Sequence, residues 1–350
     1  MMMKVHTDRI EISFTKDDTW KTVDLSSLVS NSAVGVFLEE LNTCTDCNND
    51  VMGQSTDDSI YANQTDKLNI QTYGTHFVGF PSDSQNVRLR GFDSTSKVYI
   101  RAEVYEPDFV FRSRADTASL LHSFSDGEAN TWVDKTVTPL GSDEVGDIGA
   151  VIITRSAPSN TTSWGVREKG STDAEQVMEV AFGSAGTDIV GVDGDGKYQL
   201  YAGAKDDNPD VFYAVYYEIG YILKSKLTTI TNPADEGIST TGGSYEDIDF
   251  SSTIPSGAGF ALIRWRNTGG LTRLGHTRPN GSTDTAASMA LSVRARSNNL
   301  VSLDDLRHAE YTVDNLSAQL WITGYIEREA FSSRIKGNKL IIKGNKLLMK

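Results

Sequence analysis

The sequence repeats one pattern three times at an interval of about 110 residues, and this repetition constrains the fold more than any other feature. Each copy opens with an aromatic residue, continues through a turn of small residues and then enters a short apolar segment. The opening aromatic residues are Trp20, Trp132 and Tyr245. Because a repeated sequence unit folds as a repeated structural unit, we predict three similar modules in tandem.

Two further landmarks keep the same phase. A valine at the centre of an apolar segment occurs at Val78, Val190 and Val301. The tetrapeptide Gly-Ser-Thr-Asp occupies 170–173 and again 281–284, whereas the first copy has glutamine in place of the glycine. We interpret the three valines and the three opening aromatic residues as anchors of the module cores, since large apolar side chains at repeated positions are typical of buried sites.

The apolar segments are short, rich in Val, Ile, Tyr and Phe, and bounded by Gly, Asn, Asp and Ser, which is typical of β-strands. Polar and apolar residues alternate in 197–202 and in 86–92, so one face of each strand is expected to pack and the other to meet water. Helical spacing is scarce, and 115–124 is the best helical candidate. The predicted fold class is all-β, with three tandem β-sandwich or jelly-roll-like modules and extended N- and C-terminal tails.

The predicted organisation follows from the repeat phase. Residues 10–14 alternate like a strand and are expected to pair with the first module or with a neighbour. The expected units are an N-terminal arm at 1–17, modules at 18–106, 128–222 and 243–327, linkers at 107–127 and 223–242, and a basic tail at 328–350.

Composition excludes some functions. The formal net charge of −14 and the pI of about 4.8 oppose binding to nucleic acid, which needs a basic surface. No run of eighteen apolar residues occurs, so we predict no membrane span, and no apolar run follows Lys4, so we predict no secretory signal and synthesis in the cytoplasm.

The C-terminal tail differs from the rest of the chain because it is basic and repeats the unit Ile-Lys-Gly-Asn-Lys-Leu. Gly-Asn favours a tight turn between strands, and we predict that the tail docks on a neighbouring subunit or an acidic partner by adding strands to an exposed edge. A frayed basic tail is the alternative. The predicted assembly residues are Ile335, Lys336, Lys339, Leu340, Ile342, Lys343, Lys346 and Leu347.

No motif in the sequence predicts catalysis, and we expect no catalytic, cofactor-binding or metal-binding residue. The five histidines lack metal-ligand spacing, and Cys44 and Cys47 have no second pair that would make a zinc site. Asp193-Gly194-Asp195 resembles the start of a calcium loop but lacks the later bidentate glutamate, so we interpret it as a turn between strands.

Modules that open with Trp-x-x-Val-Asp-Leu-Ser at 20–26, pass through Gly-Ser-Thr-Asp at 170–173 and 281–284, and close with Gly-Tyr-Ile at 220–222 and 324–326 resemble repeat β-sandwich domains of tailed-phage virion structural proteins. The resemblance covers about 18–327, although the first module lacks the closing Gly-Tyr. It implies a virion protein, made in the host cytoplasm, that decorates a capsid or forms part of a head fibre or tail. Its expected partners are other virion proteins and copies of itself, with a trimer preferred.

Two other functions stay open. A carbohydrate-binding array that recognises host-surface glycans would use exposed aromatic residues, for which Trp164, Trp265 and Tyr73 are the candidates. A glycan-degrading enzyme would use a pair of carboxylates, but the 47 acidic residues of the chain make such a pair impossible to select from the sequence.

Overall fold

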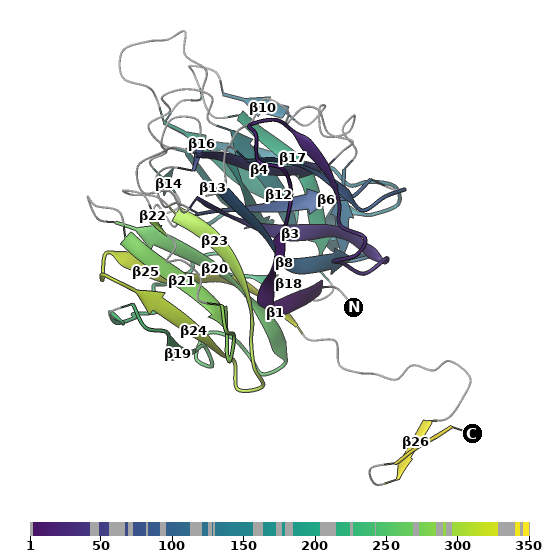
Figure 1. Ribbon diagram of the computed structural model, residues 1–350. Helices are drawn as coiled ribbons and strands as arrows, with labels where there is room; N and C mark the ends of the chain where they lie inside the picture. The colour runs from purple at the N-terminus through teal and green to yellow at the C-terminus, as the bar shows by residue number, and fades with distance from the viewer. Residues whose placement is uncertain are drawn as a thin grey trace.

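The structure is a computed structural model of the chain, and the all-β fold class is confirmed (Figure 1). The strands form several antiparallel sheets, and the described residues contain no α-helix; η3 at Val145–Asp147 is a 3₁₀ turn. The structure describes residues 3–42, 49–55, 67–68, 73–81, 83–91, 96–112, 121–124, 128, 130–156, 164–172, 177–178, 185–203, 215–224, 227–241, 243–268, 273–284, 290–291, 296–327, 340–343 and 346–349.

Three sheets, here called the central sheets, share one strand order. The first has the order β1-β8-β3-β6 with β1 at Met3–Ile12, β3 at Ala33–Asn42, β6 at Tyr73–Gly79 and β8 at Ser96–Tyr105. The second has the order β10-β17-β12-β15 with β10 at Leu121–Ser123, β12 at Ile148–Ser156, β15 at Ala185–Gly191 and β17 at Val215–Leu223, and β9 at Phe109–Phe111 also pairs with β17. The third has the order β18-β25-β20-β23 with β18 at Leu227–Thr229, β20 at Ala258–Asn267, β23 at Arg296–Ser302 and β25 at Ala318–Glu327.

Three further sheets, here called the outer sheets, also share an order. The first, β2-β7-β4-β5, has β2 at Lys21–Asp24, β4 at Asn49–Ser55, β5 at Lys67–Leu68 and β7 at Asn86–Gly91. The second, β11-β16-β13-β14, has β11 at Trp132–Thr136, β13 at Trp164–Glu168, β14 at Val177–Met178 and β16 at Lys197–Ala202. The third, β19-β24-β21-β22, has β19 at Glu246–Asp249, β21 at Arg273–Pro279, β22 at Ala290–Leu291 and β24 at His308–Val313.

Each outer sheet packs on one central sheet around its own hydrophobic cluster, and we call each such unit a sheet pair. Strand alternation produces these clusters because every second side chain of a strand points to the same face. Val78, Val190 and Val301 lie in the clusters of the first, second and third sheet pair, with exposed fractions of 2%, 4% and 0%.

The central sheets also share a pair of irregularities. The pairing of β3 with β8 shifts register between Ala33 and Gly35 and again between Phe37 and Leu38. The pairings of β12 with β17 and of β20 with β25 shift at the equivalent two places. In each sheet the second shift leaves one extra residue on the long partner strand. This residue is Arg101 in β8, Ile219 in β17 and Thr323 in β25. Since a β-bulge re-aims the side chain at its position, these three residues are placed similarly in the three sheets.

A fourth hydrophobic cluster joins all three central sheets. It contains Phe37 and Phe77 from the first sheet, Ile152 from the second, and Leu262 and Leu300 from the third. The sequence predicts modules that each bury a separate interior, and the structure adds this shared interior. The reason is that each central sheet has a second apolar face, turned away from its outer sheet. The strand pattern of one repeat does not show that this face packs against the other repeats.

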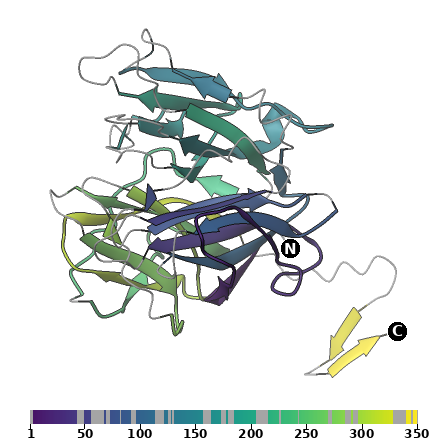
Figure 2. The same ribbon diagram turned by 45° about the horizontal axis from the view of Figure 1, so that its top comes forward.

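Segments expected outside the modules supply strands to the central sheets (Figures 1 and 2). The expected arm contains β1, which pairs with β8, and the expected linkers contain β9, β10 and β18. Within the helical candidate 115–124 the described residues 121–123 form strand β10, so the helix prediction is wrong there. Pairing with the long strand β17 satisfies the backbone of this segment, which outweighs a weak local helical preference.

The closing motif Gly-Tyr-Ile has a steric cause. A Cβ atom at Gly324 would lie 2.7 Å from the carbonyl oxygen of Thr228 on the neighbouring strand β18 and 3.3 Å from Leu262 Cδ1. We expect Gly324→Ala to lower the free energy of unfolding by about 1–3 kcal/mol, because backbone atoms of a paired strand cannot move aside easily. Urea denaturation measures this change. Gly146→Ala is the control, since its Cβ meets nothing within 4 Å, and an equal effect in both variants would contradict the steric explanation.

Candidate assembly site

The N-terminal strand β1 contacts the Gly-Ser-Thr-Asp segment at 281–284, which belongs to the third sheet pair. The carboxylate of Asp8 accepts a hydrogen bond from Ser282 Oγ at 2.9 Å and another from the backbone N–H of Thr283 at 2.8 Å. These hydrogen bonds hold the pKa of Asp8 below its ordinary value. The first and last sheet pairs of the chain are therefore joined directly.

The other Gly-Ser-Thr-Asp segment, which begins at Gly170, makes an equivalent contact. Oδ1 of Asn232, which follows β18, accepts hydrogen bonds from the Ser171 hydroxyl at 3.2 Å and from the backbone N–H of Thr172 at 2.9 Å. Asp8 and Asn232 are separated by about twice the repeat interval. In both cases the Ser-Thr segment of one sheet pair binds a short polar side chain near the first strand of another central sheet, since Asp8 lies within β1 and Asn232 follows β18.

An ion network lies beside the Asp8 contact. The Arg101 guanidinium donates from Nε to Glu39 Oε1 at 2.8 Å and from Nη2 to Asp284 Oδ2 at 2.9 Å. The backbone N–H of Arg9 also reaches Asp284 Oδ2 at 3.2 Å, and Arg9 Nη1 lies 3.5 Å from Glu39 Oε2. Arg101 is the bulge residue of β8, so the bulge places its side chain between the first and third sheet pairs.

Burial makes this network electrostatically strong. Arg101 and Glu39 have side chains that are 1% and 0% exposed. Burial alone would raise the pKa of Glu39, but the adjacent Arg101 guanidinium outweighs it and lowers that pKa to about 2. Burial lowers the pKa of the neighbouring His276 to about 3, so this imidazole is neutral, and its Nδ1 lies 2.7 Å from the Tyr245 hydroxyl.

Two other buried glutamates are also held by basic side chains. Glu103 Oε1 lies 2.6 Å from Lys4 Nζ, and its other oxygen accepts the Tyr105 hydroxyl at 2.8 Å. Glu218 forms a buried ion pair with Arg112. These carboxylates are occupied by contacts between strands, and their chemistry is that of structural ion pairs.

Removal of the Asp8 carboxylate tests the contact between β1 and the 281–284 segment. We expect Asp8→Ala to lower the free energy of unfolding by about 1 kcal/mol, since two hydrogen bonds to an exposed carboxylate are lost. Asp8→Asn should retain most of the stability because the amide oxygen still accepts. Urea denaturation provides the values, and Glu11→Ala on the same strand is the control. An Asp8→Ala variant as stable as the control would contradict the contact.

The three opening aromatic residues are not equivalent core anchors. Each ring lies under an arginine, with distances from guanidinium carbon to ring centroid of 5.4 Å for Trp20, 3.9 Å for Trp132 and 3.6 Å for Tyr245. Trp20 packs partly on the shared cluster, whereas Trp132 and Tyr245 belong to none of the four hydrophobic clusters. The arginines are on other strands of the same outer sheets: Arg88 is on β7, next to β2, whereas Arg167 and Arg278 lie two strands from β11 and β19. The spacing of the aromatic residues did not indicate these contacts.

Of the three aromatic candidates for sugar stacking, the structure describes the side chain of Trp265 alone. Trp265 is 0% exposed within the cluster of the third sheet pair, so it cannot present a face to a sugar. It was ambiguous in sequence because it alternates with two arginines. Trp164 and Tyr73 lie in β13 and β6, but the side chains of both residues, like Cys44 and Cys47 altogether, lie outside what the structure describes.

The aspartate segment that resembles a calcium loop forms a turn. Asp193 Oδ1 accepts the backbone N–H groups of Asp195 and Lys197, and Asp304 makes the same two bonds to Leu306 and His308 in the third sheet pair. Such a side chain mimics a backbone turn. Within the described part of the chain, no group of three or more His, Cys, Asp or Glu side chains is arranged to hold a metal ion.

The predicted assembly tail forms a hairpin where it is described. Strand β26 at Leu340–Lys343 pairs with β27 at Lys346–Met349, and Lys343 is the partner of Lys346 across the connection. In the described residues the two strands pair only with each other, and Figure 1 draws them apart from the six sheets. Ile335, Lys336 and Lys339 lie outside the described residues, and so do the side chains of Leu340, Ile342, Lys343, Lys346 and Leu347.

Sequence reasoning found the Gly-Ser-Thr-Asp repeat but missed what it binds. Asp8 and Asn232 lie in segments that were expected to be an arm and a linker. Their separation by twice the repeat interval is a signal that the sequence does contain, although a single short polar residue carries little weight. Glu39 and Arg101 gave no signal, because nothing in the local pattern separates a buried ion pair from exposed charges.

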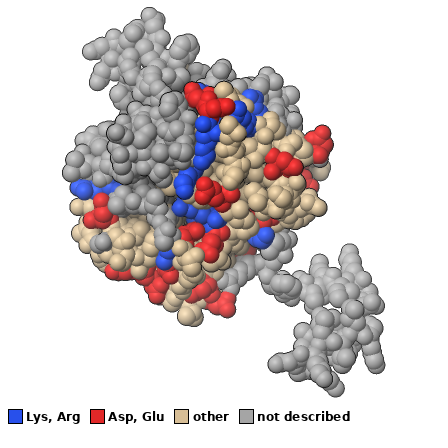
Figure 3. Space-filling view, viewed as in Figure 1, with Lys and Arg blue, Asp and Glu red and all other residues tan. Residues whose placement is uncertain are grey.

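Comparison with known families and curated proteins found no match. No family model matches the chain, and no curated protein matches it. Among the described residues there is no helix with the length and apolarity needed to span a membrane. On the face shown in Figure 3, acidic and basic side chains are interspersed.

Proposed function

We propose that the three sheet pairs are three jelly-roll modules closed into a ring within one chain. In each pair the central sheet takes the first, eighth, third and sixth strands, and the outer sheet takes the second, seventh, fourth and fifth, if β9 is set aside as an addition. This alternation between two four-stranded sheets is the jelly-roll order. The contacts of Asp8 and Asn232, and the shared cluster, support the closure.

On this basis the protein is a non-enzymatic structural component of a phage-like particle, located on the virion as a capsid decoration, head fibre or tail component. The observation that carries the proposal is the threefold recurrence of one jelly-roll strand order around a shared core. Jelly rolls are common in viral capsid proteins, and symmetric arrangement of like modules is usual in their assemblies. The acidic body and the buried, cation-paired glutamates Glu39 and Glu218 agree with a scaffold role.

Co-sedimentation tests the location. Particles released by the cells that produce the protein would be banded in a density gradient and digested for peptide mass spectrometry. The proposal predicts that peptides of this chain band with the particles in constant ratio to the major capsid protein. Recovery of the chain only in the soluble fraction would contradict a virion role.

Oligomerisation in this proposal runs through the basic tail. The hairpin β26–β27 has two unpaired edges in the described structure, and an isolated two-stranded hairpin is only marginally stable. We expect the full chain to form a homo-oligomer and a chain ending at residue 327 to be monomeric. Native mass spectrometry measures both. Replacing Lys343 and Lys346 with glutamate keeps the full length of the chain and separates the effect of charge from that of strand addition. An oligomer unchanged by the deletion would rule out a role of the tail in oligomerisation.

A further inference from the structure

The outer face of the second outer sheet presents two aromatic rings side by side. Trp132 on β11 is the register partner of Tyr201 on β16, and register partners in an antiparallel pair project to the same face. Their ring centroids are 5.3 Å apart with an interplanar angle of 47°. Neither ring belongs to a hydrophobic cluster, so their apolar surface is not used to build a core.

A row of polar side chains adjoins the rings on the same face. Arg167 Nε donates to Gln199 Oε1 at 2.7 Å, and Gln199 Nε2 donates to Asp134 Oδ1 at 2.8 Å. Lys169 Nζ lies 2.5 Å from Asp134 Oδ2, and this contact holds the pKa of Asp134 below its ordinary value. These bonds fix the orientation of a guanidinium, an amide and a carboxylate on this face before any ligand binds.

A glycine lies opposite the tyrosine on the neighbouring strand. On β13 the register partner of Tyr201 is Gly165, which contributes no side chain to this face. Arg167 reaches across the sheet and lies over Trp132 at 3.9 Å, and Tyr201 is half-buried. The Tyr201 hydroxyl donates to Asn130 Oδ1 at 3.3 Å, and Asn130 is exposed at the end of the row.

The repeat fold does not require the second ring. In the equivalent positions of the other outer sheets, Tyr201 is replaced by Arg90 and Thr312. In the third sheet pair, moreover, the hydroxyl of the opening aromatic residue Tyr245 lies 2.7 Å from His276 Nδ1. The pair of adjacent aromatic rings with an aligned polar row is therefore a property of the second outer sheet and not of the module.

We propose that the face formed by Trp132, Tyr201, Asp134, Gln199 and Arg167 binds an oligosaccharide. A planar ring stacks on the C–H face of a pyranose, while amide, carboxylate and guanidinium groups bind its hydroxyls through directional hydrogen bonds. The same side chains suit nucleic acid poorly because the molecule carries a formal net charge of −14. A sugar class with flat apolar faces, such as β-linked hexoses, fits this arrangement best. This site is independent of the proposed particle role.

A microarray of bacterial and mammalian oligosaccharides, probed with the labelled full-length chain, tests the site. We expect binding to a subset rich in β-linked hexoses, and a loss of at least tenfold in affinity in Tyr201→Ala and Trp132→Ala by titration calorimetry with the best array ligand. Tyr201→Phe should stay within about threefold, since it keeps the stacking surface. Absence of any oligosaccharide bound above background would overturn the proposal.

The matched control is Arg90→Ala, which changes the equivalent position of the first outer sheet and should leave binding unchanged. Near-ultraviolet circular dichroism and thermal melting of each variant separate loss of the site from loss of the fold. If Tyr201→Ala does not fold, Asp134→Asn provides the same test through the polar row. Binding that survives in both Tyr201→Ala and Asp134→Asn places the ligand elsewhere and contradicts the assignment.

Discussion

Arg101→Met is expected to lower the free energy of unfolding by about 3–5 kcal/mol, because it leaves a buried carboxylate without its cation. Glu39 is 0% exposed and takes two hydrogen bonds from the Arg101 guanidinium, at 2.8 and 3.2 Å. The variant also removes the link from Arg101 to Asp284, so both the first and the third sheet pair lose a partner. Urea denaturation at neutral pH measures the loss.

Lys97→Met on the same strand is the control for Arg101→Met. The Lys97 side chain is 37% exposed and its Nζ lies 3.8 Å from Oε2 of the exposed Glu11, so its removal should cost less than about 1 kcal/mol. If the two variants lose similar stability, the buried network contributes no more than a surface ion pair, and the predicted role of Arg101 is wrong.

The pH dependence of the free energy of unfolding provides an independent test of the Glu39–Arg101 pair. The folded pKa of Glu39 is about 2 and its ordinary value is 4.5, so its contribution is complete above pH 4.5 and is lost as the pH falls towards 2. In Arg101→Met the same carboxyl keeps its burial but loses the cation, so its pKa should rise. The variant should therefore lose less stability than the wild type between pH 4.5 and 2, and a parallel decline in both would contradict this.

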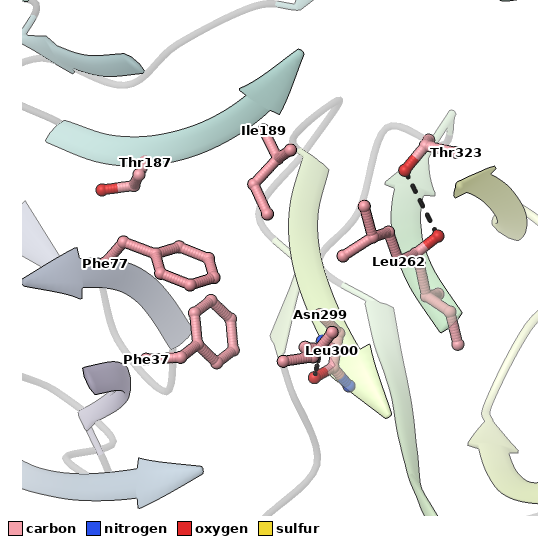
Figure 4. Close-up of a pocket in the computed structure, with 9 residues that line it drawn as sticks. Phe37, Phe77, Thr187, Ile189, Leu262, Asn299, Leu300 and Thr323 are labelled. Atoms are coloured by element: carbon pink, nitrogen blue, oxygen red, sulfur yellow. Dashed lines mark hydrogen bonds between the residues drawn. The ribbon is translucent and has the colours of Figure 1, made fainter. Parts of the chain in front are cut away.

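Phe77→Ala is the second substitution with a large expected effect, a loss of about 3–5 kcal/mol. Phe77 is 5% exposed, its ring centroid lies 4.7 Å from that of Phe37 and 5.9 Å from that of Phe109, and truncation would leave a cavity next to both rings. Figure 4 shows Phe37 and Phe77 facing each other, with Ile189 and Leu300 from the other two central sheets nearby.

The position of Phe77 predicts how its effect spreads. Because the shared cluster joins three sheets, Phe77→Ala should raise amide hydrogen exchange in β12 and β20 as well as in β3 and β6. Leu316→Ala is the control, since Leu316 is 64% exposed and its truncation should change stability by less than about 0.5 kcal/mol. Faster exchange confined to β3 and β6 would show that the first sheet pair unfolds alone.

Periodicity explains what the sequence could predict. Alternation and residue type were sufficient for the all-β class and for the strands around Val78, Val190 and Val301, because those patterns depend on a single strand. The shared cluster involves the opposite face of strands from three repeats, and no local pattern states which distant faces meet. Phe37 and Leu262, which face the shared cluster, cannot be distinguished by residue type from their neighbours Val36 and Ile263, which face the outer sheets.

The candidate sites were harder to predict for a related reason. Trp265 stands between arginines and resembles a surface residue, yet the outer sheet covers it, while Trp132 resembles a core residue and lies on a polar face. Assignment of a face needs the strand register, which is set by pairing with a strand that is distant in the sequence. Arg101 depends on a bulge, which moves one side chain without any change in composition.

The central claim is that three sheet pairs form one cooperative unit around the shared cluster. Hydrogen exchange followed by mass spectrometry, in increasing urea, tests it by resolving peptides from β7, β16 and β24, one strand from each outer sheet. One common transition midpoint for the three peptides is the result that we predict. Three separate midpoints would contradict the closed unit, since each sheet pair would then be held by its own interior alone.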